Sequence, residues 1–421
     1  METLRPRSHQ GGRCPVQPPV PRPVNPDRRR VRTSPDHVAG RRFRSCWDRK
    51  STVRLHDSSI MENPSLSETA MSAQPAIERT VVLHVGMHKT ASTYIQKRLR
   101  KNRGLLRRHG LLMPARRTQD RVLLDALANG RWKPWRRWLN RAETRGCHLL
   151  VSHEALSWSL SRTVNLKSQP RGLWLAEKLQ DHGWQLKVVG FIRDQESYLN
   201  SRYTQLVKRL TVHGDFKSYV TWVMTESTIS ECDLMALFGW LVDHVSVETV
   251  MIPFGSALDC RGRSIQTRPD PYEQLLAELP LPAKVAKQSR PARSKNQQPG
   301  RLGVALARAI GTHLTEQNPK ILRKHDKALR AAIETLARQQ GWPNQPFDGL
   351  DTELRETIRD RYAHSNAEFC RCFWPFVQWD DLFPAQHENV TTAIASDQQQ
   401  EETRQLTALR DRLIADTVNG G

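Results

Sequence analysis

Short apolar runs alternate with stretches of helical periodicity over the middle of the chain. Four nearly continuous runs, rich in β-branched residues, predict buried strands at 80–86, 148–152, 185–192 and 248–252. Apolar residues at helical spacing predict helices from Ser92 onward and over 172–183, 196–210, 216–224, 301–340 and 351–373. Strands that alternate with helices indicate an α/β fold, in which helices flank a parallel sheet on both faces.

Composition divides the 421 residues into three parts. Residues 1–78 are rich in Pro, Arg, Ser and Gly without an apolar period, so we expect a disordered basic extension. The alternatives are a start site assigned too early, with Met61 and Met71 as other starts, and an arm that binds nucleic acid. The domain at 79–383 contains a Gln- and Pro-rich loop at 284–299 and a helical C-terminal part at 300–383. We expect the polar tail at 384–421 to be frayed.

The net charge limits the kinds of partner. The chain carries a formal charge of +22, and its first 50 residues, with 13 Lys and Arg against 4 Asp and Glu, contribute +9. Such a field attracts nucleotide phosphates, acidic glycans, nucleic acids and anionic membranes, and charge alone does not choose among them. Hydrophobic residues are only 38% of the chain because the ends are polar, so the middle can still form a core.

Membrane and metal signals are missing from the sequence. The chain has no apolar run of about 18 residues and no apolar secretion signal, so we expect a cytoplasmic protein without a transmembrane segment. Seven cysteines are scattered, and Cys370 and Cys372 lack the spacing and the second ligand pair of a zinc site. We therefore expect reduced thiols and no metal.

The first predicted strand leads into a segment suited to bind an anion, Gly86-Met-His-Lys-Thr-Ala-Ser-Thr93. Gly86 permits a sharp turn, and the N–H groups and dipole of the following helix favour a negative charge. Lys89 adds a full positive charge, and the hydroxyls of Thr90, Ser92 and Thr93 are further donors. The alternative is an ordinary helix N-terminus with Thr90 or Ser92 as its N-cap. Only three residues separate Gly86 from Thr90 and no second Gly precedes Lys89, so the Walker A motif of ATPases is absent.

A second motif follows the third predicted strand. Arg193 ends that strand, and Ser201 lies eight residues later on the next helix, sharing one face with Gln205 and Lys208. An Arg at the end of a strand and a Ser across a short gap can bind one phosphate from two sides.

Together the two motifs resemble those of PAPS-dependent sulfotransferases. His-Lys-Thr followed by small hydroxyl residues is similar to the family's 5′-phosphosulfate-binding loop, and Ile-Arg…Ser-x-Tyr-x4-Lys is similar to its 3′-phosphate-binding segment. The similarity to bacterial sulfotransferase-like proteins extends over about 81–383 and implies a P-loop NTPase-like sulfotransferase fold. Phe216–Tyr219, Val250–Pro253 and Leu354–Asn366 match pieces that we expect to be structural. Asn296 lies where relatives carry Asn-x-Ser near the nucleotide.

The resemblance implies a donor and the residues that hold it. The donor is 3′-phosphoadenosine 5′-phosphosulfate (PAPS), and no metal is expected. The residues implied at the 5′-phosphosulfate are Gly86, His88, Lys89, Thr90, Ala91, Ser92 and Thr93. Arg193 and Ser201 are implied at the 3′-phosphate. The family often has Pro two residues after this Arg, where the present chain has Gln195.

A catalytic base is expected at the end of the second predicted strand. Ser152-His153-Glu154 must lie at the same sheet edge as the anion-binding segment, and related proteins often have Ser-Ser-Glu there. We expect Glu154, ahead of His153, to accept the acceptor's proton, and Lys89 to stabilise charge on the leaving phosphate. Alternatively, Glu154 caps or salt-links a helix and His153 is a solvated loop residue.

The acceptor is left open by the sequence, as is the oligomeric state. A glycan, a lipid head group or a small metabolite fits, and we expect no specific nucleic-acid partner. Residues 131–138 interleave cations with tryptophans, which suits an anionic acceptor, a sugar or a membrane, or else a packing stripe. Two other functions compete: a P-loop kinase or NTPase that uses Mg-ATP, with Glu154 on Mg²⁺, and a non-catalytic polyanion-binding protein.

Overall fold

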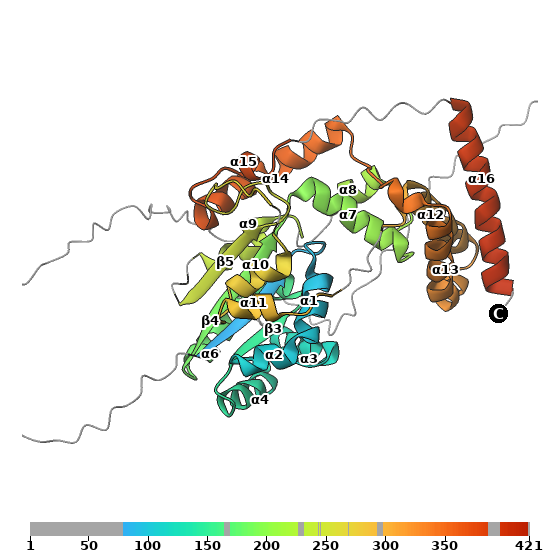
Figure 1. Ribbon diagram of the computed structural model, residues 1–421. Coiled ribbons are helices and arrows are strands. Elements are labelled where there is room, and N and C mark those ends of the chain that lie inside the picture. The colour runs from blue at the N-terminus through green and yellow to red at the C-terminus, as the bar shows by residue number, and fades with distance from the viewer. Residues whose placement is uncertain are drawn as a thin grey trace, which may run out of the picture. The chain divides into compact units, whose positions relative to one another are not determined.

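One parallel sheet organises the protein (Figure 1). The computed structural model describes residues 79–163, 169–225, 231–242, 244, 246–267, 269–292, 298–385 and 396–419. The predicted extension at 1–78 and the Asn296 position lie outside these ranges. Within the described residues the sheet has five strands in the order β2-β3-β1-β4-β5. The strands are β1 (Arg79–Gly86), β2 (Leu111–Leu112), β3 (His148–Ser152), β4 (Trp184–Ile192) and β5 (Val247–Pro253). The predicted α/β class is confirmed.

Helices cover both faces of the sheet because consecutive strand residues are apolar and point to opposite sides. Val82 and Phe191 are fully buried on one face, which is covered by α1 (Ser92–Lys101), α2 (Arg103–Arg108), α10 (Pro271–Ala277) and α11 (Lys284–Gln288). Val81 and Leu83 are fully buried on the other. That face is covered by α3 (Arg117–Ala128), α4 (Trp132–Glu143), α5 (Leu156–Ser161), α6 (Arg171–Gln180), α7 (Gln195–Lys208), α8 (Phe216–Thr225) and α9 (Leu234–Phe238). The predicted loop at 284–299 is therefore wrong at its start, where α11 buries Val285.

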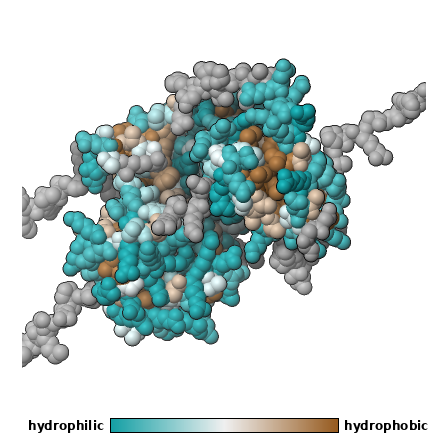
Figure 2. Space-filling model, turned by 45° about the vertical axis from the view of Figure 1, so that its right-hand side comes forward, coloured by the Kyte–Doolittle hydropathy of each residue, from teal (hydrophilic) through white to brown (hydrophobic). Residues whose placement is uncertain are grey.

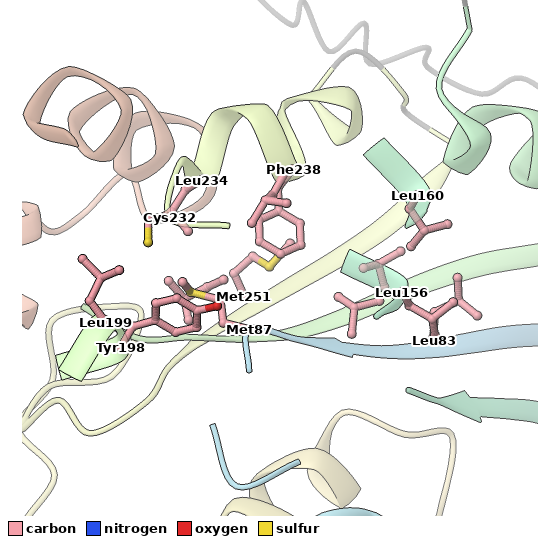
Figure 3. Close-up of a cluster of buried hydrophobic side chains, with 14 of the residues drawn as sticks. Leu83, Met87, Leu156, Leu160, Tyr198, Leu199, Cys232, Leu234, Phe238 and Met251 are labelled. Carbon is pink, nitrogen blue, oxygen red and sulfur yellow. The ribbon is translucent and has the colours of Figure 1, made fainter. Parts of the chain in front are cut away.

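The larger core reaches the end of β1. Figure 3 shows Leu83 and Met87 among the buried side chains of α5, α7 and α9, which include Leu156, Tyr198 and Phe238. Met87 is only 2% exposed although it already belongs to the segment that follows the strand. Burial of a side chain of this size contributes about 1.5–3 kcal/mol. The segment that follows β1 is thus anchored near its start by the core.

The C-terminal part is helical, as expected. The helical stretch predicted at 301–340 consists of two helices, α12 (Gly300–Gln317) and α13 (Pro319–Gln339). Asn318 accepts from the Lys320 N–H and caps α13, and Pro319 occupies the first helical turn, where no N–H is needed. The following helices are α14 (Thr352–Phe373), α15 (Trp379–Leu382) and α16 (Ser396–Ile414).

The expectation of a frayed tail is wrong for its described portion. Helix α16 packs against α12 through the partly buried Leu406, Leu409 and Leu413. Arg301 donates to both carboxylate oxygens of Glu402, at 2.8 and 2.6 Å. A two-bond pair of this kind is stronger than an ordinary surface ion pair and, with the leucines, holds the polar helix in place.

Helix α14 is tied to the sheet and to the start of α7 by buried hydrogen bonds. Trp374, which follows α14, donates its Nε1–H to the Met251 carbonyl of β5 at 2.8 Å. Gln195 and Asn366 are both buried and exchange amide hydrogen bonds at 2.6 and 3.1 Å. Gln195, the position at which the chain departs from the family pattern, therefore has a structural partner in the C-terminal part.

Hydrophilic side chains cover most of the face seen in Figure 2, and hydrophobic ones gather in a few patches. Among the described helices, none combines the length and the apolar character that crossing a bilayer requires.

Candidate functional site

Strand register brings the ends of four strands to one level. Gly86 of β1 pairs with Phe191 of β4, and His84 of β1 pairs with Ser152 of β3. Ile192 of β4 pairs with Pro253 of β5. The segments that leave these strands must therefore start side by side. From β1 the chain runs to β2 and β3, which lie on one side of β1, and then crosses to β4 and β5 on the other side. The direction of the strand order therefore reverses at β1, and ligands of open α/β sheets bind at such a switch point.

The backbone after β1 has the form of an anion-binding nest. Lys89 and Ala91 both have left-handed conformations, with φ of 70° and 57°, on either side of Thr90. Alternating left- and right-handed residues turn successive N–H groups toward one point. A left-handed non-glycine residue costs about 1–3 kcal/mol, so this loop stores strain where a ligand would use it.

Gly86 is needed for space rather than for a left-handed turn. A Cβ atom at this position would lie 3.1 Å from Thr90 Oγ1 and 3.2 Å from Ser92 Oγ. The Thr90 hydroxyl donates to the Met87 carbonyl at 2.7 Å, so it braces the loop and is fully buried. Thr90 therefore does not face the cavity described below, whereas Ser92 and Thr93 do.

Lys89 and Arg193 meet at the centre of the site. Arg193 Nη1 donates to the Lys89 carbonyl at 3.1 Å, and Arg193 Nε donates to Ser197 Oγ at 2.7 Å. Asp194 caps α7 by accepting from the Ser197 N–H at 2.7 Å, and also accepts from the Ser197 hydroxyl. Burial lowers the pKa of Lys89 to about 8, and the neighbouring Arg193 adds repulsion. A cationic site of this kind is stabilised by any anion that enters it.

Glu154 lies at the edge of the same site, and His153 does not. Gln96 Nε2 donates to Glu154 Oε2 at 2.9 Å, and Arg117 Nη2 lies 3.3 Å from Oε1. Burial would raise the pKa of Glu154, but the hydrogen bond from Gln96 and the charge of His153 outweigh it, so the pKa lies below its usual value. Glu154 is thus ionised near pH 7. His153 is 9% exposed, and its Nδ1 accepts from the Ala155 N–H at 3.1 Å.

Two further histidines lie in the loop and in the strand before it. His88 lines the site, and burial together with the charge of Arg202 lowers its pKa. His84, below the loop, shares a 2.7 Å hydrogen bond with Ser152 Oγ, and burial lowers its pKa to about 4. Both imidazoles are therefore neutral near pH 7, and the positive charges that line the site belong to Lys89, Lys97 and Arg193.

A cavity of about 640 Å³ joins these parts. The predicted site residues that line it are His88, Lys89, Ala91, Ser92, Thr93, Glu154, Arg193 and Ser201, and Gln205 of the second motif lines it as well. The other predicted site residues, Gly86, Thr90 and His153, are close to lining residues in the sequence but do not line the cavity themselves. Within the described residues, no cluster of three His, Cys, Asp or Glu side chains could hold a metal ion. The described cysteines form no disulfide.

Several lining residues were not predicted from the sequence. Phe254 directly follows β5 and lines the cavity, so the end of that strand was a usable signal. Tyr94 donates to Asp270 Oδ2 at 2.6 Å and accepts from Arg98 at 2.9 Å, which joins α1 to the start of α10. Asp270 is 176 residues from Tyr94, and no local pattern announces that contact.

No protein-family model matches the chain, and no curated protein or solved structure is detectably similar to it. Its function must therefore be inferred from the chemistry of this cavity.

Proposed function

We propose that this protein is a sulfotransferase that moves the sulfuryl group from PAPS to a hydroxyl acceptor. One observation carries the proposal: the Lys89 turn and the Arg193 strand end line the same cavity and are joined by a hydrogen bond. PAPS carries anions at both ends of its ribose, and a cavity with cationic side chains from two different segments is complementary to such a molecule.

Each half of the cavity would hold one end of the donor. The N–H groups of the loop, Lys89 and the Ser92 hydroxyl suit the 5′-phosphosulfate, since a nest at a helix N-terminus favours bound anions. Arg193 and Ser201 suit the 3′-phosphate. Arg193 is fixed by Ser197 and by the Lys89 carbonyl, so little side-chain freedom is lost when it binds.

The transfer itself needs positioning, charge and one proton acceptor. The acceptor oxygen forms a bond to sulfur as the bond between sulfur and the 5′-phosphate oxygen breaks, and adenosine 3′,5′-bisphosphate (PAP) leaves. The acceptor's proton passes to Glu154, the ionised carboxylate at the cavity edge. Lys89 neutralises the charge that grows on the leaving phosphate oxygen.

Calorimetric titration with PAP, 5′-AMP and ATP tests the proposal. PAP and AMP differ only in the 3′-phosphate, so we expect PAP to bind about 100-fold more tightly, because a charge-assisted phosphate contact is worth on the order of 2–3 kcal/mol. Arg193→Ala should remove most of that difference. Lys97→Ala, an exposed cation on the wall of the same cavity, is the control and should change it little.

Equal binding of PAP and AMP by the wild type would remove the assignment. A preference for ATP that requires Mg²⁺ would favour a kinase or NTPase.

A further inference from the structure

A second basic surface lies on α4, whose apolar stripe is buried and whose polar face is almost entirely cationic. Trp135 and Leu139 are 0% and 2% exposed, so the helix is anchored in the core. Lys133, Arg137, Arg141 and Arg145 are exposed at intervals of four residues. At about 1.5 Å per residue, the three cations from Lys133 to Arg141 extend for about 12 Å along α4, and Arg145 lies in the turn that follows the helix.

Hollows lie on both sides of this row. One of about 620 Å³, here called the α4 groove, is lined by Gln119 and Val122 of α3 and by Trp132, Lys133, Arg137 and Arg141 of α4. The other, of about 500 Å³, shares the three cations. In the described part of the chain no Asp or Glu lines either hollow. Like charges four residues apart destabilise a helix, so a bound polyanion would relieve the repulsion.

The contacts of the tryptophans of α4 indicate which kind of polyanion the surface suits. Trp132 packs edge-on against Trp174 and lies 5.0 Å from the His182 ring. The Arg141 guanidinium covers Trp138, 5.2 Å from the ring centre. Rings that already have such partners are less available for base stacking, on which single-stranded nucleic-acid binding depends. The apolar stripe of α4 is buried and cannot enter a membrane. Cations in a row favour an extended chain with repeated carboxylates or sulfates.

Helix α3 connects the groove to the cavity. Arg117, its first residue, pairs with Glu154 at 3.3 Å, and Gln119 and Val122 of the same helix line the groove. Arg117 and Val122 are separated by about 8 Å along the helix axis. A polymer bound in the groove could therefore extend past Arg117 to the cavity edge.

We propose that the α4 groove binds an acidic polysaccharide and presents its hydroxyl groups to the Glu154 edge of the cavity as acceptors. The binding step stands alone, and the acceptor role rests on the proposed function.

Fluorescence anisotropy with labelled polygalacturonate tests the binding. The variant Lys133→Gln/Arg137→Gln/Arg141→Gln should bind about tenfold more weakly, because each exposed ion pair contributes modestly. The matched control, Lys320→Gln/Arg323→Gln/Lys327→Gln, removes three exposed cations from α13 and should bind within about twofold of the wild type. Equal weakening in both variants would show attraction by net charge alone and would overturn the proposal. Tighter binding of a thymidine oligonucleotide or of anionic vesicles, lost in the α4 variant, would also overturn it.

A measurement on the wild type does not depend on the variants. Bound polygalacturonate should protect Lys133 from acetylation and leave Lys320 unprotected. If the polymer does not reduce the acetylation of Lys133, binding at α4 is contradicted.

PAP affinity separates the two proposals. The α4 variant should bind PAP like the wild type, whereas Lys89→Met should bind the polysaccharide like the wild type. A wild type that binds the polymer at α4 but not PAP would refute the sulfotransferase and spare the groove.

Discussion

The cavity at the strand ends and the α4 groove are both cationic, but they are built in opposite ways. In the cavity, Arg193 is held by hydrogen bonds to the Lys89 carbonyl and to Ser197, and burial lowers the pKa of Lys89 to about 8. In the groove, Lys133, Arg137 and Arg141 are exposed on a regular helix. Buried charges are screened little by salt and respond to pH, whereas exposed ones are screened strongly. The same residue types can thus serve a specific small anion in one place and a long polyanion in another.

The largest effect is expected where the two regions meet, at Glu154. Glu154→Gln keeps the contact with Gln96 possible but removes the proton acceptor, so transfer from PAPS to a polysaccharide hydroxyl should fall about 10²–10⁴-fold. PAP and polygalacturonate affinity should stay within about threefold, since the variant removes no cation. Radiolabelled sulfate transfer measures the rate. An undiminished rate would assign Glu154 the purely structural role of bonding α1 and α3.

Lys89→Met compares one cation of the cavity with one of the groove. We expect PAP affinity to fall about 100-fold, because the loss of a partly buried charge-assisted contact costs on the order of 2–3 kcal/mol. Lys133→Met should weaken polygalacturonate binding only about two- to threefold. Calorimetry and anisotropy provide the two affinities. If the two substitutions reduce the two affinities by similar factors, the partly buried cation of the cavity contributes no more to binding than the exposed cation of the groove.

Much of this arrangement could be predicted from the sequence, because apolar runs mark the ends of buried strands. Lys89, Glu154 and Arg193 each follow such a run by a few residues, and a parallel sheet brings those ends to one edge. The left-handed conformation of Lys89 could not be predicted, since lysine has no preference for it and the loop as a whole imposes it.

Contacts between distant segments were equally hidden. Tyr94 with Asp270 and Gln195 with Asn366 depend on how the C-terminal half packs, which no local pattern records. Strand β2, two residues long, is too short to produce a recognisable run.

The pH dependence sharpens the comparison further. The anion favours the protonated form of Lys89, whose pKa in the free protein is about 8. Above that pH, PAP binding must take up a proton, and its affinity should fall by up to about tenfold per pH unit. Calorimetry at pH 7 and 9 in buffers of different ionisation enthalpy would detect the uptake, and polygalacturonate binding should show none. The free energy of unfolding of the ligand-free protein changes in the opposite direction. Between pH 8 and 10.5 the Lys89 amine is protonated in the unfolded chain but not in the folded protein, so the folded protein becomes more stable as the pH rises.

Salt should separate the regions by a smaller factor. Raising KCl from about 50 to 300 mM should weaken polygalacturonate binding about tenfold, because several exposed contacts release counterions together. PAP binding should weaken about threefold, since its partners are partly buried. Equal salt slopes for the two ligands would show that the cavity holds its anion by the same solvated contacts as the groove.

The smallest effect concerns two glycines on either side of α1. Gly86→Ala would push the Thr90 and Ser92 hydroxyls away from a new Cβ atom at 3.1 and 3.2 Å, so we expect a loss of about 1 kcal/mol in the free energy of unfolding. Gly104, on the exposed face of α2, has no atom within 4 Å of the place that a Cβ would occupy, and Gly104→Ala should gain about 0.5–1 kcal/mol from helix propensity. Urea unfolding measures both. Because the Thr90 hydroxyl braces the loop through the Met87 carbonyl, Gly86→Ala should also weaken PAP binding, whereas Gly104→Ala should not. If Gly86→Ala stabilises the protein and binds PAP normally, the loop is not closely packed around Gly86. Packing against Gly86 would then not explain the left-handed conformations of Lys89 and Ala91.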